Sequence, residues 1–131
     1  MKGCQEFIIE KKFADLDAGW ISIGASKRGW ANFLIGAAEC PSCVNIIAII
    51  PLVPIIPDYI LNIHRMYQAF GGVSYFFKPY ILADNLKYTD SPFLVKGAKY
   101  MDPLSFKGSY NRKKLPILIA LSSSDEFMMM D

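Results

Sequence analysis

The most informative part of the sequence for the fold is Ile21-Ser22-Ile23-Gly24-Ala25-Ser26-Lys27-Arg28-Gly29-Trp30. A short apolar run enters small residues, and a helical pattern begins directly after Ser26, which predicts a strand, a tight turn and a helix. Serine at such a turn is typical of a nucleophile elbow, where a strained backbone pushes the hydroxyl into the site. The backbone N–H of Lys27, at the start of the helix, would then help to stabilise an oxyanion.

The same stretch departs from the general Gly-x-Ser-x-Gly signature of that turn. The second glycine, Gly29, comes one place late, and Arg28 occupies the position where a small residue is expected. The alternative is an ordinary strand-to-helix turn in which the Ser26 side chain caps the helix. Residues alone leave both interpretations open.

Two further runs, 44–50 and 115–121, are nearly all apolar like 20–24. Strands that are apolar on both faces are typical of a parallel sheet covered by helices on both sides. We expect the second strand to leave the sheet at Pro51 and the helix 27–39 to make the crossover. The sequence therefore predicts an α/β fold, one domain over residues 1–131 with about three parallel strands and flanking helices. Further helices are expected at 2–13 and, within a helical insert at 58–112, at 59–70, 75–85 and 92–101.

Composition narrows the class of protein. Of the 131 residues 53% are hydrophobic and 20% charged, which excludes intrinsic disorder. Fourteen basic and twelve acidic residues give a net charge of +2, which argues against a nucleic-acid partner. Residues 44–63 are long and apolar enough to span a bilayer, but Pro51, Pro54 and Pro57 interrupt a continuous helix, so we expect no membrane span. The share of hydrophobic residues is high for a free-standing domain and suggests the interior of a larger protein.

Cysteine and histidine are too few for a metal or redox site. Cys4, Cys40 and Cys43 form no disulfide framework, and the lone Cys40-Pro41-Ser42-Cys43 lies between a helix and a strand rather than at a helix N-terminus. His64 is the single histidine, and a zinc site needs four good ligands. We expect no cofactor and no metal. The N-terminus lacks the uninterrupted apolar segment of a signal peptide.

The heptapeptide Gly24-Ala25-Ser26-Lys27-Arg28-Gly29-Trp30 resembles the hallmark of the PhoPQ-activated pathogenicity-related family, which includes autocrine proliferation repressor-like proteins. The late glycine belongs to that family's own pattern. Further stretches agree in order and spacing over residues 1 to about 127. They are 44–51, Leu61-Asn62, Met66-Tyr67, Phe70-Gly71-Gly72, Met101-Asp102-Pro103-Leu104-Ser105-Phe106, and 115–127.

The resemblance implies an α/β-hydrolase fold with a serine-acid-histidine triad. Ser26 then corresponds to the nucleophile and Asp125 to the triad acid, in the chain order Ser…Asp…His of that fold. Independently, Asp125 follows an apolar strand, at the edge where α/β sites assemble, although a turn aspartate would look the same. In the family the histidine lies downstream of the acid, so His64 is not assigned that role. We expect this chain to be an internal or C-terminal fragment, inactive as it stands.

Two functions from different classes remain. The first is a secreted serine hydrolase of peptidase or esterase type, with a peptide or ester substrate. The second is a non-enzymatic secreted signalling protein, a proliferation repressor, on the same scaffold, since fold does not settle function. A truncated product without a function of its own is a third, weaker alternative. The insert is rich in aromatic residues that would suit an apolar ligand or a peptide side chain, but helix packing is the favoured explanation. They are Tyr59, Tyr67, Phe70, Tyr75, Phe76, Phe77 and Tyr80.

Overall fold

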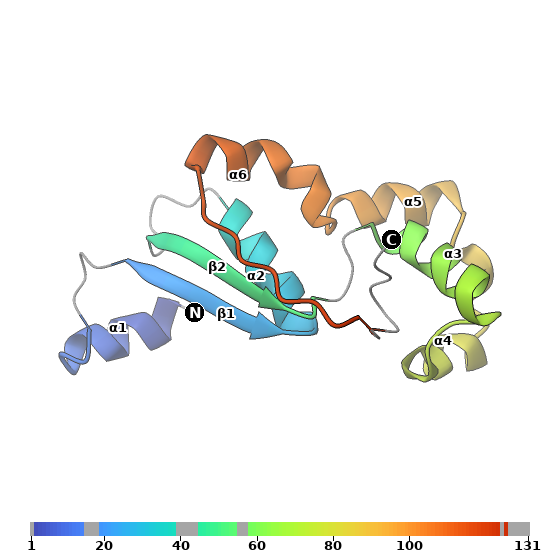
Figure 1. Cartoon of the computed structure of the whole chain (residues 1–131), viewed down its shortest axis with the longest axis horizontal. Coiled ribbons are helices and arrows are strands. Elements are labelled where there is room, and N and C mark those ends of the chain that lie inside the picture. Colours follow the sequence, from blue (N-terminus) through green and yellow to red (C-terminus); the bar gives the residue numbers. More distant parts are fainter. Residues whose placement is uncertain (1, 15–18, 39–44, 55–57, 124, 126–131) are drawn as a thin grey trace.

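The computed structural model describes residues 2–14, 19–38, 45–54, 58–123 and 125 (Figure 1). Within these ranges the chain is a mixed α/β structure with a parallel two-stranded sheet and six α-helices. The elements, in chain order, are α1 (Lys2–Glu10), β1 (Trp20–Ala25), α2 (Lys27–Ala37), β2 (Ile46–Leu52), α3 (Tyr59–Phe70), the 3₁₀ turn η1 (Tyr75–Phe77), α4 (Lys78–Leu82), η2 (Leu86–Tyr88), α5 (Pro92–Lys99), η3 (Pro103–Phe106) and α6 (Lys107–Lys113).

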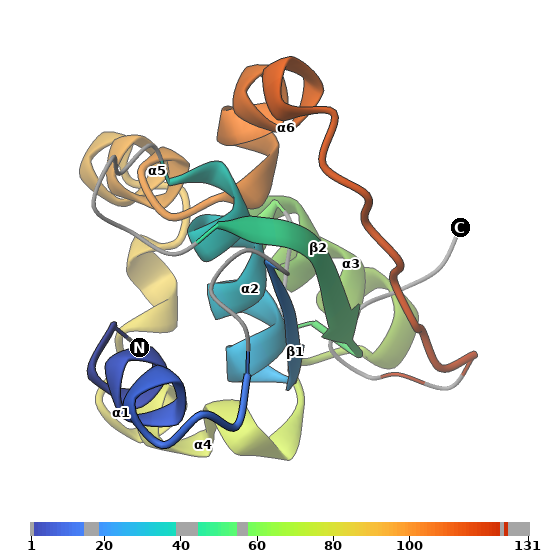
Figure 2. The ribbon, with the colours of Figure 1, turned by 90° about the vertical axis from the view of Figure 1, so that its left-hand side faces the viewer.

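The two strands and the helix between them form the predicted parallel crossover. β1 pairs with β2 in a register that sets Ser22 opposite Ile49 and Gly24 opposite Pro51. α2 packs on one face of both strands (Figure 2). Ile49 is fully buried beneath this helix, and a Cβ added to Gly36 would stand 3.2 Å from its Cδ1. Apolar strand residues therefore bury against α2, as the sequence pattern indicated.

A regular third strand does not form in the described residues, which corrects the prediction for 115–121. The segment runs parallel to β2 but makes only two isolated bridges, Ile49 with Ile117 and Leu52 with Ala120. Its hydrogen bonds begin regularly, with the Ile49 N–H donating to Pro116 O and the Leu118 N–H to Ile49 O, both at 3.1 Å.

Pro51 explains the interruption. The ladder resumes where the Ala120 N–H donates to Pro51 O at 3.1 Å and the Val53 N–H to Ala120 O at 2.7 Å. The bond that should join the two halves would come from the N–H of residue 51, which proline lacks. The expectation that the chain leaves the sheet at Pro51 is wrong, because β2 continues to Leu52. Pro51 breaks the outer ladder while remaining in the strand.

Several helix boundaries also differ from the sequence-based expectation. α1 ends at Glu10 rather than residue 13, α2 at Ala37 rather than 39, and α5 at Lys99 rather than 101. The helix expected at 75–85 is divided into η1 and α4, and α6 was not expected. Residue 44, Cys40 and Cys43 lie outside the described residues.

Helices α3, α4 and α5 lie beyond the carboxyl ends of the strands (Figure 1). Asp58 caps α3, accepting from the Leu61 N–H at 3.1 Å, and its own N–H donates to Asp102 Oδ1 at 3.2 Å. Asp102 also accepts from the Leu104 N–H at 2.9 Å, at the start of η3. Asp58 and Asp102 thus join the start of α3 to the start of η3, 44 residues further along the chain.

Within the described residues the sheet face opposite α2 is open, which corrects the expectation of helices on both sides of the sheet. Ile21 and Ile23 are 55% and 61% exposed, and Leu118 is 66% exposed. Among the described residues no strand pairs with the outer edge of β1. Part of the apolar side-chain surface of the sheet is therefore exposed. None of the helices within the described ranges has the length and apolar character to cross a membrane.

Candidate active site

Ser26 occupies a strained turn between β1 and α2. Its backbone has φ 56° and ψ −123°, outside the regions that residues with a Cβ ordinarily adopt. The turn is fixed on both sides, because the Ser26 N–H donates to Leu52 O at 3.0 Å and the Trp30 N–H donates to Ser26 O at 3.1 Å. Such a conformation costs about 1–3 kcal/mol and persists only when its surroundings impose it.

Two glycines make this turn possible. A Cβ on Gly24 would lie 2.8 Å from the backbone carbonyl carbon of Arg28, and one on Gly29 would lie 3.0 Å from Gly24 O. Gly29 also packs against the backbone of Pro54 and Leu52. The late glycine of the sequence is therefore a packing requirement between the helix and the strands, while Arg28 is exposed.

The side chain of Ser26 is exposed and makes no capping hydrogen bond. An N-cap serine normally has an extended backbone and accepts from the second or third helical N–H. The alternative interpretation of Ser26 as an ordinary cap is therefore wrong. The N–H of Lys27 belongs to the first turn of α2, where N–H groups have no intrahelical acceptor and carry the positive end of the helix dipole.

A buried asparagine, which the sequence did not single out, ties α2 to both strands. Ser22 Oγ donates to Asn32 Oδ1 at 2.7 Å, and Asn32 Nδ2 donates to Ile50 O at 3.4 Å. Asn32 is buried, so losing either partner would leave a polar group unsatisfied. This contact fixes the position of the helix that begins after Ser26.

Asp125 lies at the same edge of the sheet as Ser26. Ala25 is opposite Leu52 on one side, and Ala120 bridges to Leu52 on the other. With about 5 Å between neighbouring strands, Ala25 and Ala120 stand roughly 10 Å apart at one level. Asp125 follows five residues later, is half-buried and donates its N–H to Ser122 O at 3.2 Å. Both residues follow the carboxyl end of their segment, where α/β sites assemble.

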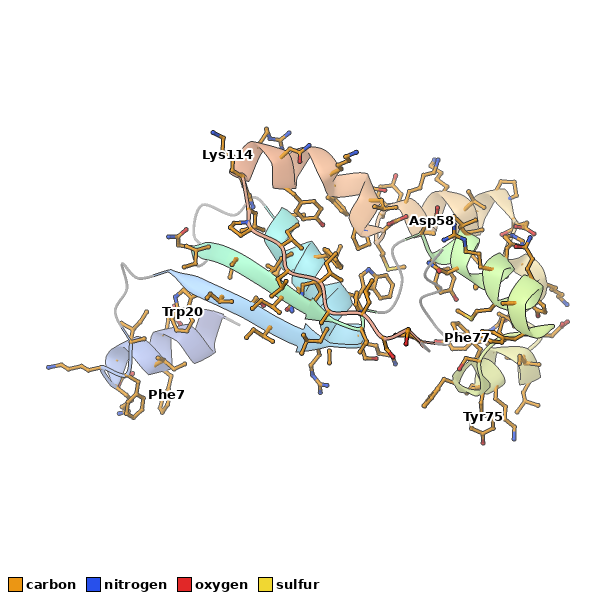
Figure 3. All side chains as sticks on the ribbon, viewed as in Figure 1. Phe7, Trp20, Asp58, Tyr75, Phe77 and Lys114 are labelled. Carbon is orange, nitrogen blue, oxygen red and sulfur yellow. The ribbon has the colours of Figure 1, made fainter. Side chains whose placement is uncertain are left out.

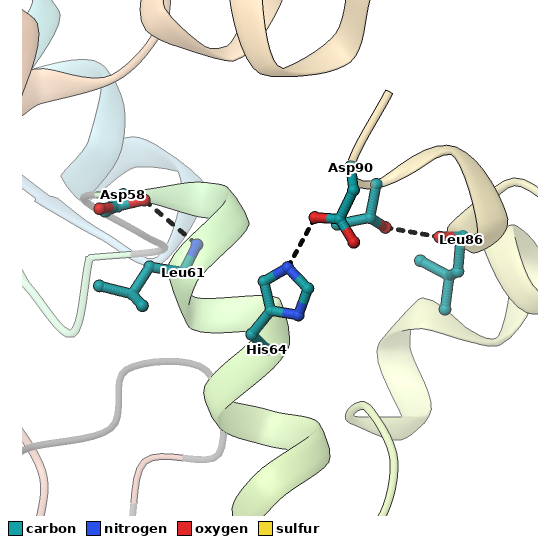
Figure 4. A network of polar contacts seen from close by, with 6 residues as sticks. Asp58, Leu61, His64, Leu86 and Asp90 are labelled. Carbon is teal, nitrogen blue, oxygen red and sulfur yellow. Dashed lines mark hydrogen bonds and ion pairs between the residues drawn. The ribbon is translucent and has the colours of Figure 1, made fainter. Parts of the chain in front are cut away.

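His64 is held within the helical region rather than by Ser26. Its Nε2 atom is 2.7 Å from Asp90 Oδ1, which links the middle of α3 to the turn before α5 (Figure 4). The His64 side chain is about half exposed and that of Asp90 largely exposed. Within the described residues no three His, Cys, Asp or Glu side chains gather as they would around a metal ion.

Three long-range contacts that the sequence did not indicate hold α2 against the later helices. Trp30 Nε1, one turn after Ser26, donates to Met101 O at 2.7 Å. The Tyr110 hydroxyl donates to Phe33 O at 3.0 Å. Lys113 Nζ donates to the carbonyls of Gly36, at 3.0 Å, and Ala38, at the C-terminal end of α2.

The Tyr110 phenol is perturbed by this position. Burial, and to a smaller extent the charge of Asp102, raises the pKa of Tyr110 to about 12. The neutral phenol is therefore the form that the fold favours, consistent with its donated hydrogen bond.

The aromatic residues of the insert have different roles. Phe77 is buried and points among the helices, while Tyr75 points outward (Figure 3). Tyr67, Phe70 and Phe76 are exposed as well. Helix packing therefore accounts for Phe77, and the rings of Tyr59 and Tyr80 pack beside it.

Together these features define a mixed α/β protein with an exposed serine on a strained turn at the carboxyl edge of a parallel sheet. The chain belongs to the PhoPQ-activated pathogenicity-related protein family, whose model matches residues 1–131. It is 33% identical over all 131 residues to the autocrine proliferation repressor protein A of Dictyostelium discoideum. The chain spans 25% of the length of that curated relative. No solved structure shows significant similarity.

Proposed function

We propose that this chain carries the nucleophile turn of a serine hydrolase of peptidase or esterase type, on an α/β-hydrolase scaffold. Ser26 is the nucleophile, Asp125 the triad acid and the Lys27 N–H an oxyanion donor. The observation that carries the proposal is the Ser26 backbone, strained at φ 56° with its hydroxyl exposed and engaged in no cap. Strain of this kind is retained where a hydroxyl must be presented to a substrate.

The chemistry follows from that placement. Ser26 Oγ attacks the substrate carbonyl carbon, the carbonyl oxygen becomes an oxyanion near the α2 N-terminus, and collapse expels an amine or alcohol to form an acyl-serine. Water then cleaves the acyl-serine and releases the acid. The attack requires a base to take the serine proton, and the single histidine, His64, is hydrogen-bonded to Asp90. We expect the 131-residue chain alone to turn over substrate at background rate.

Labelling with a fluorophosphonate tests the proposal, because Ser26 Oγ would displace fluoride from phosphorus. Without an added base we expect no labelling above background. Millimolar imidazole, acting as an exogenous base, should then produce labelling that Ser26→Ala abolishes. Ser105→Ala, an exposed serine in η3, is the matched control and should label like the parent chain. Equal labelling of the parent chain and Ser26→Ala with imidazole would refute the nucleophile assignment.

A second function is favoured by the name of the relative, an autocrine proliferation repressor protein. A non-enzymatic secreted regulator would slow cell proliferation without Ser26 chemistry. Purified chain and Ser26→Ala can be added to cultures of Dictyostelium discoideum, with the doubling time measured. Equal slowing by both proteins, with no imidazole-dependent labelling, would support this alternative over the hydrolase.

A further inference from the structure

A cavity of about 550 Å³ lies in the helical region, between α3, α4, η2 and α5. Its volume falls within the range of small-molecule sites. Four aromatic rings and two leucines supply most of its wall. They are Tyr59 from α3, Tyr80 from α4, Leu86 and Tyr88 from η2, and Phe93 and Leu94 from α5.

A buried ring fixes two of these aromatic walls. Phe77 packs with Met66 in the core of the helical region, and its centroid lies 6.5 Å from that of Tyr59 and 6.0 Å from that of Tyr80. Tyr59 and Leu86 pack against the same core. The cavity is therefore built on an ordered base, and its tyrosines are held at separations typical of tilted aromatic pairs.

The wall opposite α3 is fixed by local hydrogen bonds. The buried Thr89 hydroxyl donates to Leu86 O at 2.6 Å, and Ser91 Oγ accepts from the Leu94 N–H at 3.2 Å. The His64–Asp90 contact joins this turn to α3 (Figure 4). The hydroxyls of Thr89 and Ser91, which line the cavity, are thus already engaged in hydrogen bonds within the chain.

The lining carries no charged side chain, and the charged groups beside it already have partners in the fold, Lys87 with Asp84 and Asp90 with His64. Lys87 Nζ lies 5.1 Å from the centroid of the Tyr88 ring and pairs with Asp84. A cationic ligand would meet this ammonium at the ring that should attract it. An anion would find no charged partner among the lining residues. Burial, with a smaller effect of the neighbouring Tyr80, raises the pKa of Tyr59, so its phenol stays neutral in ordinary buffers.

We propose that this cavity binds a neutral aromatic small molecule. Phe93 supports that assignment because it is 88% exposed although it begins a helix beside the cavity. A ring so exposed gains by stacking on a flat apolar ligand that enters beside it. The site stands independently of the Ser26 chemistry.

Titration of the full chain with N-phenyl-1-naphthylamine, a neutral dye that fluoresces in apolar surroundings, tests the site. We expect saturable binding of one dye. Phe93→Ala should weaken it about tenfold, as expected for loss of one stacking ring, and Asn85→Trp should block the cavity. Phe70→Ala, an exposed phenylalanine of α3 outside the lining, is the matched control and should bind normally.

Two comparisons make the result decisive. The open sheet face could also take up dye, so Ile23→Lys should leave binding unchanged; loss of binding in this variant but not in Phe93→Ala would overturn the site. Neutral 2-naphthol should displace the dye, while benzyltrimethylammonium and naphthalene-1-sulfonate should do so at least tenfold less well. Equal displacement by a charged competitor would overturn the neutral class, and unchanged binding in Ser26→Ala is expected.

Discussion

Replacing Ser26 by glycine should stabilise the fold, because glycine adopts φ 56°, ψ −123° without a Cβ penalty. Release of the strain contributes about 1–3 kcal/mol. The greater freedom of glycine in the unfolded chain costs about 0.5–1 kcal/mol. The net expectation is a rise of roughly 0–2.5 kcal/mol in the free energy of unfolding. Ser26→Ala keeps the Cβ and should change stability by less than about 0.5 kcal/mol.

Urea unfolding followed by tryptophan fluorescence suits this measurement, because Trp20 lies in β1 and Trp30 in α2. Ser109→Gly, within the regular helix α6, is the control and should lose about 0.5 kcal/mol. If Ser26→Gly destabilised the chain as much as Ser109→Gly does, the turn would hold no strain. Exposure of the Ser26 hydroxyl would then cost the fold no stability.

Three further changes test the surroundings of the turn. Gly24→Ala should cost roughly 1–3 kcal/mol in chemical unfolding, because its Cβ would meet the Arg28 backbone at 2.8 Å; a neutral result would contradict the close helix–strand contact. Tyr110→Phe should cost about 0.5–1.5 kcal/mol at pH 8 through the lost bond to Phe33 O. The pKa of Tyr110 is raised from 10.0 to about 12 in the fold, so its contribution to the free energy of unfolding is present below pH 10 and is lost as pH rises through about 12. In melting experiments at different pH values, Tyr110→Phe should lack that loss of stability at alkaline pH. Lys113→Met should lower stability by about 0.5–1 kcal/mol at low salt and less at high salt, because Lys113 caps α2; an effect unchanged by salt would count against this role.

The strand-to-helix turn could be predicted because its information is local. Gly24, Ser26 and Gly29 lie within six residues, and the small residues and the helix start impose the geometry together. The apolar run before the turn was sufficient for β1, and the crossover helix followed from its length. Asp125 could be placed at the sheet edge for the same reason, since it follows an apolar run.

The outer ladder could not be predicted from apolar pattern alone. Both 44–50 and 115–121 have strand composition, yet the absent N–H of Pro51 divides their pairing. The effect depends on which side of β2 residue 51 faces, and sequence does not reveal that before the register is known.

Contacts between distant residues were equally hidden. Tyr110 and Lys113 both reach α2 across 77 positions, and Asn32 has no sequence feature that distinguishes it from a surface asparagine. The cavity could not be predicted from the sequence for the same reason. The aromatic run before residue 81 was visible in the sequence, but Tyr88 and Phe93 join Tyr59 and Tyr80 only through the fold.

The most direct test of the central claim is to map the modified residue after fluorophosphonate treatment in imidazole, by peptide mass spectrometry of the whole chain. The account predicts that the phosphonyl group is found on Ser26, at an occupancy well above that of every other serine. Modification spread evenly over exposed serines such as Ser105 and Ser123, or absent from Ser26, would contradict it.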